Sequence, residues 1–202
     1  MGFSRMLLVG GAAALAMAGT PALAAGAKAA APTAKAAASV ELAGLPRLLA
    51  MEEMKNDRLT FCRSLDSHDW PALRATMADD FELHWTDTTG PNGAAGRPPI
   101  DIKGADQFVT FAQQILSKGK SIHICTMPQF VHVGTDSARA LWFINGYGQI
   151  GEMNGIGYER VVEDYVRVNG KWLIRKADAN IEVQSFTSAK GEPVQPPSLP
   201  GK

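Results

Sequence analysis

The sequence predicts one α+β domain in which three N-terminal helices cover one face of a curved antiparallel sheet. Apolar residues recur at helical spacing up to about residue 116, and they then alternate with polar residues as far as residue 186. When helices come first and long strands follow, the helices usually pack on one face of the sheet. The 202 residues, 46% of them hydrophobic, suit one core of ordinary size.

A secretory signal peptide is predicted before this domain. Arg5 precedes an apolar run over residues 6–18, and Ala22 and Ala24 form an A-x-A cleavage site, so we expect cleavage after Ala24. The run is shorter than the ~20 residues that span a bilayer, so we expect no stable membrane insertion. The mature protein is therefore expected to be periplasmic or secreted.

Two segments beside the domain lack the composition of a folded core. Residues 25–39 are rich in Ala, Lys and Pro and hold almost no large apolar side chain, which predicts a flexible tether. Residues 188–202 contain four prolines, which predict a disordered tail. The folded domain is therefore expected over residues 40–187.

Three helices are expected in the first part of this domain. Apolar residues at near-helical spacing run from Pro46 to Asp66, and proline is tolerated in a first helical turn. A short second helix is predicted over residues 70–77 and a third over residues 108–116, where the glycine that follows ends it.

The strands are predicted from alternation. Phe81, Leu83 and Trp85 alternate with polar residues and predict the first strand, and a loop rich in Pro and Gly is expected over residues 86–99. Longer strands are predicted over residues 121–133, 138–150, 155–168 and 171–186, with Asn169 and Gly170 in a tight hairpin turn between the last two.

Charge and motifs exclude several classes of function. Lys plus Arg and Asp plus Glu each number 20, so no basic field is available to gather nucleic acid. The sequence has no phosphate-binding glycine loop, no nucleophile elbow and no H-E-x-x-H zinc motif. We therefore expect no nucleic-acid partner, no metal and no cofactor.

Asp66 and His123 are the candidate acid–base residues. Asp66 follows Cys62 by one helical turn, and His123 stands two residues before Cys125 on a strand, so each pair shares a face. From the residues alone, Asp66 can also be a solvated turn residue, and His123 can be a core histidine. Cys62 and Cys125 are either a disulfide or two buried thiols.

Aromatic and polar residues predict a pocket for a small hydrophobic molecule. Phe143, Asn145 and Tyr147 alternate on one face of a strand, and Trp85 lies on the first strand. If that face is concave, these side chains line the pocket together with Phe61, Cys62 and Cys125.

Six short segments, in this order and spacing, resemble one known family. They are FCRSLDSHDW at 61–70, ADDF at 78–81, IKG at 102–104, IH at 122–123, ARALW at 138–142 and DYVRVNGKWLI at 164–174. Through them, over about residues 51–183, the chain resembles the SnoaL-like branch of the nuclear transport factor 2-like superfamily, which includes scytalone dehydratase-type and bile-acid dehydratase-type enzymes. The resemblance implies a cone-shaped fold and allows a homodimer through the sheet face.

The resemblance also implies roles for individual residues. In the dehydratase-type members, an Asp on the first helix and a His on the strand after the third helix perform acid–base work. By position these are Asp66 and His123, with His123 taking or returning a proton while Asp66 sets its protonation. The sequence departs from the pattern in two places: Phe61 replaces a Tyr, and Asn145, which cannot transfer a proton, stands nearest to the place of a second His or Asp.

Three functions remain open from the sequence. The first is a cofactor-independent dehydratase or isomerase of a small hydrophobic hydroxy or keto compound that uses Asp66 and His123. The second is a periplasmic module that binds such a compound without converting it, which Phe61 and Asn145 favour. The third is a dimeric interaction module.

Overall fold

The computed structural model describes residues 39–90 and 96–195. The predicted signal peptide, nearly all of the predicted tether and the end of the predicted tail lie outside the described residues. In chain order the elements are α1 (Gly44–Ser67), α2 (Trp70–Arg74), β1 (Met77–Asp87), β2 (Arg97–Lys103), α3 (Ala105–Leu116), β3 (Gly119–Val133), β4 (Ser137–Ile150), β5 (Met153–Val168) and β6 (Lys171–Ser188).

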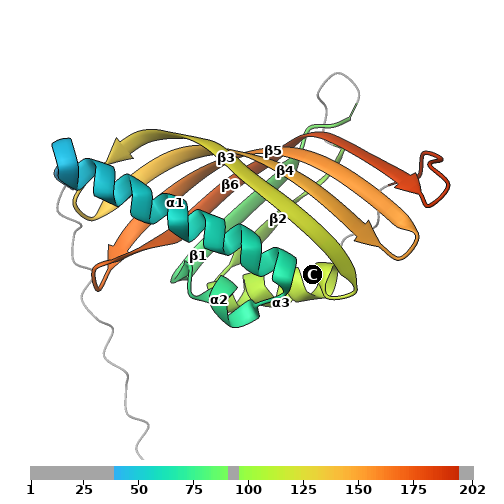
Figure 1. Cartoon of the computed structure of the whole chain (residues 1–202), viewed down its shortest axis with the longest axis horizontal. Helices are drawn as coiled ribbons and strands as arrows, with labels where there is room; N and C mark the ends of the chain where they lie inside the picture. Colours follow the sequence, from blue (N-terminus) through green and yellow to red (C-terminus); the bar gives the residue numbers. More distant parts are fainter. Residues whose placement is uncertain (1–38, 91–95, 196–202) are drawn as a thin grey trace, which may run out of the picture. The chain divides into compact units, whose positions relative to one another are not determined.

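The strands form one curved, unclosed sheet with the order β2-β1-β6-β5-β4-β3 (Figure 1). The four pairs β1–β2, β3–β4, β4–β5 and β5–β6 are antiparallel, whereas β1 and β6 run parallel. The α+β class is therefore confirmed, but the expectation of a purely antiparallel sheet is wrong. The parallel pair arises because β6, at the end of the three-hairpin run that starts with β3, returns beside β1 in the same direction.

β2 occupies part of the segment that was expected to be a loop. The Pro98–Pro99 pair suggested a break, since proline cannot donate a hydrogen bond to a neighbouring strand. β2 lies at the edge of the sheet, where only one side of a strand must be paired, and its pairing with β1 shifts register between Trp85 and Asp87. An edge strand with such an irregularity accepts proline.

The helices pack on one face of the sheet (Figure 1). Phe108 of α3 stacks against Phe61 of α1 with ring centroids 5.5 Å apart, and its ring also meets the edge of Phe81 of β1 at 5.3 Å. After α1, the C-cap residue His68 has a left-handed φ of 59° and turns the chain. The Asp69 side chain then caps α2 by accepting from the Ala72 N–H at 3.0 Å. These aromatic contacts fix the ends of α1 and α3 over the sheet.

The chain after β6 turns back on the end of that strand. The Ser188 N–H donates to the Glu192 carbonyl at 2.8 Å, and the Val194 N–H donates to the Phe186 carbonyl at 3.0 Å. Residues 189–194 therefore fold back against the end of β6.

None of the helices within the described residues is long and apolar enough to cross a membrane.

Candidate functional site

A disulfide between Cys62 and Cys125 joins α1 to β3, with the two Cα atoms 6.8 Å apart. The sequence left two interpretations open, and the structure shows the bonded one. Because Cys62 lies one helical turn before Asp66 and Cys125 lies two residues after His123, the bond brings the two candidate catalytic residues to the same place.

Asp66 and His123 form a hydrogen-bonded pair. The Nδ1 atom of His123 lies 2.6 Å from Oδ1 of Asp66, and the His123 backbone N–H donates to Oδ2 at 2.8 Å. The Ser121 hydroxyl donates to Oδ1 at 2.8 Å. Burial alone would raise the pKa of Asp66, but the hydrogen bonds from His123 and Ser121 outweigh burial and lower this pKa.

This arrangement decides which nitrogen of His123 can act as a base. Because Asp66 stays ionised, its carboxylate accepts a hydrogen bond from the protonated Nδ1 of His123. Nε2 is then the unprotonated, basic nitrogen of the neutral ring. The side chains are 24% exposed for His123 and 22% exposed for Asp66, so the pair is neither solvated nor sealed. A ligand can therefore reach the ring.

An inner cavity of about 170 Å³ lies between the helices and the sheet. Its walls are mostly apolar and aromatic, and they include Phe61, Trp85 and Phe108. Arg58, His123 and Glu159 are its ionisable lining residues. A space of this kind, apolar with a few polar groups, is typical of a site for a small hydrophobic molecule.

An outer cavity of about 180 Å³ adjoins the inner one, since both are lined by Trp85, His123 and Glu159. Four of its lining residues are glycines that pair across two strands, Gly146 with Gly157 and Gly148 with Gly155. A Cβ atom on Gly146 would lie 3.9 Å from Nε2 of His123. The glycines therefore leave bare backbone in front of the basic nitrogen.

Glu159 was not identified from the sequence. Burial raises the pKa of its carboxyl, although the positive charges of His123, Arg58 and Arg97 oppose this rise. Trp85 also lowers the pKa of Glu159, yet its buried indole Nε1 makes no hydrogen bond of standard geometry. The sequence spacing did contain a clue. Gly155, Gly157 and Glu159 are two residues apart from one another, so they share the cavity side of β5.

A buried polar network adjoins the inner cavity through Arg58. The guanidinium of Arg58 forms an ion pair with Glu163 at 2.6 Å, and the two side chains are 5% and 0% exposed. The Tyr165 hydroxyl donates to Glu163 and accepts from the Trp142 indole N–H at 3.0 Å. The charge of Arg58 lies 4.5 Å from the ring centre of Phe61, so the network holds this part of the wall in place.

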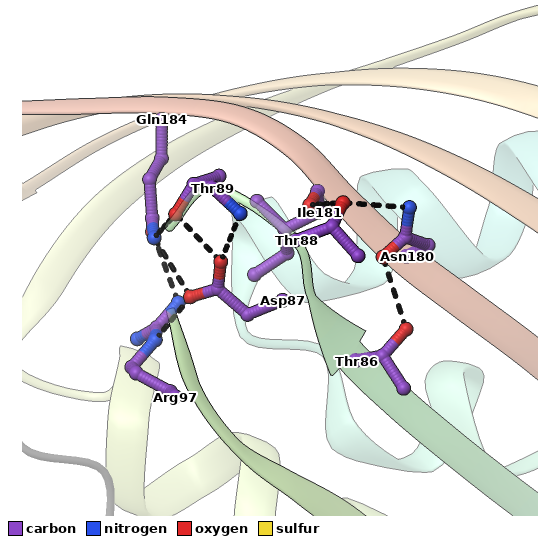
Figure 2. Close-up of polar contacts among 8 residues, drawn as sticks. All are labelled: Thr86, Asp87, Thr88, Thr89, Arg97, Asn180, Ile181 and Gln184. Atoms are coloured by element: carbon purple, nitrogen blue, oxygen red, sulfur yellow. Dashed lines mark hydrogen bonds and ion pairs between the residues drawn. The ribbon is translucent and has the colours of Figure 1, made fainter. Parts of the chain in front are cut away.

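Another network lies beside the outer cavity and is centred on Asp87 (Figure 2). Its carboxylate accepts from Nε of Arg97 and from Nε2 of Gln184, both at 2.8 Å, and also from the Thr89 hydroxyl and N–H. Burial would raise the pKa of Asp87, but these hydrogen bonds lower it. Arg97 and Gln184, which line the outer cavity, are thereby held between β1, β2 and β6.

The structure places the predicted pocket residues at different sites. Phe61, Cys62 and Trp85 line the inner cavity, and Cys125 lies in the disulfide beside it. The structure does not place Phe143 and Asn145 in either cavity, because Ile144 and Gly146 face the helices and alternation turns their neighbours to the opposite face. Tyr147 borders the outer cavity, but it is 48% exposed.

Within residues 39–90 and 96–195, no cluster of three or more metal-binding side chains is present.

Comparison with known proteins identifies the family. Residues 46–178 match the model of the SnoaL-like domain. The chain belongs to the SnoaL-like family. No curated protein matches its sequence significantly.

Solved structures share the fold at low identity. A proposed scytalone dehydratase from Novosphingobium aromaticivorans is 15% identical, with a TM-score of 0.59 over 75% of this chain and 97% of that one. The hexachlorocyclohexane dehydrochlorinase LinA-type3 from Novosphingobium barchaimii is 18% identical, with a TM-score of 0.53 over 76% and 97%. The beta subunit of a proposed aromatic-ring-hydroxylating dioxygenase from N. aromaticivorans is 9% identical, with a TM-score of 0.55 over 67% and 91%. Because such different proteins share it, the fold alone does not assign an activity.

Proposed function

We propose that this SnoaL-like protein is a cofactor-independent dehydratase or isomerase of a small hydrophobic hydroxy or keto compound. The observation that carries the proposal is the hydrogen-bonded pair of Asp66 and His123 where two cavities adjoin. An ionised carboxylate on Nδ1 fixes the ring and stabilises the imidazolium that forms when Nε2 takes a proton. The apolar wall suits a substrate with few polar groups.

In the proposed reaction, His123 removes a proton from a carbon next to a carbonyl group. In an isomerase reaction, this proton is returned to another carbon. In a dehydratase reaction, the substrate loses the hydroxyl group of the neighbouring carbon. Two proteins of similar structure support this class: one is a proposed dehydratase, which removes water, and the other is a dehydrochlorinase, which removes hydrogen chloride. Both reactions start from removal of a proton by a base.

NMR of the four histidines tests the pair. We expect D66N to change the nitrogen chemical shifts of the His123 ring, because the carboxylate that holds the proton on Nδ1 is lost. Substrate turnover should fall in parallel. His84 is the internal control, since it hydrogen-bonds to Asp101 and lies away from both cavities. If the His123 ring gives identical nitrogen shifts in both proteins and turnover is unchanged, the domain is instead a binding module for the same class of compound.

We also propose that the protein is exported, as the signal peptide pattern predicts. The disulfide supports this proposal, because disulfides persist in oxidising compartments and are rare in reducing ones. In the mature protein, Cys62 and Cys125 would pair after transport.

A homodimer through the outer sheet face is a second candidate property. Ile122, Tyr147 and Ile156 are register neighbours on β3, β4 and β5, and their exposed fractions are 59%, 48% and 59%. Apolar side chains exposed side by side favour an interface. We expect the mature protein to sediment as a dimer and I122E to sediment as a monomer. A monomeric wild type would contradict the dimer without affecting the proposed activity.

A further inference from the structure

We propose that Glu159 is the acid that protonates the leaving oxygen while His123 removes the proton from carbon. This inference rests on the proposed function and selects the dehydratase among the two reactions. It assigns a catalytic role to a residue outside the Asp66–His123 pair.

The position of Glu159 fits a group that acts on the same substrate as His123. Among the residues that the structure describes, these two are the ionisable side chains on the cavity side of the sheet that line both cavities. His123 pairs with Gly146, which pairs with Gly157, and Glu159 follows Gly157 by two residues on the same face. The base and the acid thus stand on β3 and β5, diagonally across β4, where Gly146 pairs with His123 and Ile144 pairs with Glu159.

This separation leaves room for a substrate. Two strand spacings amount to about 10 Å, so the two side chains flank a small molecule rather than bonding to each other. Gly146 lies between them, and its missing side chain keeps the space open in front of Nε2 of His123. A compound seated on β4 would present one carbon to His123 and an oxygen to Glu159.

The surroundings of Glu159 favour the protonated form of its carboxyl, which is the form that an acid needs. Its pKa is raised because burial outweighs the opposing charges of His123, Arg58 and Arg97. The two arginines have other partners, since Arg58 pairs with Glu163 and Arg97 bonds to Asp87, and His123 is neutral when it acts as the base. A carboxyl kept in an apolar cavity costs stability, so a group of this kind is typical of a functional site.

The step balances as an elimination of water. Nε2 of His123 takes the proton from the carbon next to the carbonyl, and the electron pair of that C–H bond forms the carbon–carbon double bond. The C–O bond on the neighbouring carbon breaks with its electron pair on oxygen, and the Glu159 carboxyl donates its proton to this oxygen. The products are an unsaturated ketone and water. The imidazolium and the carboxylate are then reset by transfer of one proton through water.

A leaving-group comparison tests this role. The substrates are a panel of apolar β-hydroxy ketones, including the aldol adduct of benzaldehyde and acetone, each paired with its O-acetyl ester. Acetate leaves without being protonated, whereas hydroxide does not. We expect E159Q to slow elimination from the alcohols by about 100-fold or more and from the esters by less than about tenfold. H123N should slow both.

Controls separate this inference from the proposed function. E182Q removes a carboxyl that is paired with Arg160 and lines neither cavity, and it should leave both rates unchanged. Equal losses in E159Q for alcohols and esters would overturn the acid role while leaving the base intact. A wild type that converts no member of the panel, or an H123N variant as active as wild type, would overturn the proposed function and this inference together.

Infrared spectroscopy provides a readout that does not depend on activity. We expect the wild-type protein at neutral pH to show a protonated-carboxyl band that E159Q lacks and E182Q retains. If E159Q removes no such band, Glu159 is ionised and cannot donate the proton, even when the His123 variants behave as expected.

Discussion

The double variant C62A/C125A is expected to lose roughly 4 kcal/mol of its free energy of unfolding, because the disulfide closes a long loop. The two cysteines are 63 residues apart, so the bond removes much of the chain entropy of the unfolded state. Urea unfolding of the mature protein measures the change through the midpoint of the transition. The disulfide joins α1 directly to β3, so we also expect the separation of Asp66 and His123 to become variable in this variant.

The reduced wild-type protein is the matched control for this variant. Reduction breaks the same bond without changing a side chain in the core, so it should lower the midpoint by a similar amount. It should also weaken the hydrogen bond between Asp66 and His123, which the nitrogen chemical shifts of the His123 ring report. Equal midpoints for the oxidised and reduced protein would contradict a stabilising role for the disulfide.

The pairing of Asp66 with His123 illustrates what sequence spacing can predict. Each residue shares a face with a cysteine, and the resemblance to dehydratase-type proteins suggested that the two faces meet. Spacing along an element fixes such local relations, because the periods of helix and strand are constant. It did not decide between a disulfide and two thiols, since that depends on how α1 lies across β3.

The face of a strand was the step that the sequence could not supply. Alternation correctly grouped Phe143 with Asn145, but it does not say which of the two faces is concave. Register decides this, because Gly146 pairs with His123 and so shares the cavity face. Glu159 was missed for the same reason, since its face became meaningful only after β5 was paired with β4.

The ion pair of Arg58 and Glu163 leads to the other large expected effect. We expect R58M to lose about 3–5 kcal/mol of its free energy of unfolding at pH 8, because a carboxylate remains buried without its cation. Burial already raises the pKa of Glu163, and Arg58 opposes this rise. Without Arg58, the folded-state pKa rises further above the unfolded value. The folded protein then holds a proton that the unfolded chain releases, so the loss should grow as the pH rises from about 5 to 8.

Two comparison variants make this prediction specific. The double variant R58M/E163Q should recover most of the loss and remove its dependence on pH, because no charge is then buried and the Gln oxygen still accepts from Tyr165. R139M breaks the exposed ion pair with Asp164, where the side chains are 53% and 34% exposed, so it should cost at most about 1 kcal/mol. The pKa of Asp57 is raised by burial to about 7, and the charges of Glu163 and Arg58 also act on it, so all variants are compared in a D57N background. The difference in free energy of unfolding between R58M and the double variant therefore isolates Glu163. If the loss of free energy in R58M is independent of pH, Arg58 acts through packing on Phe61 rather than through its charge.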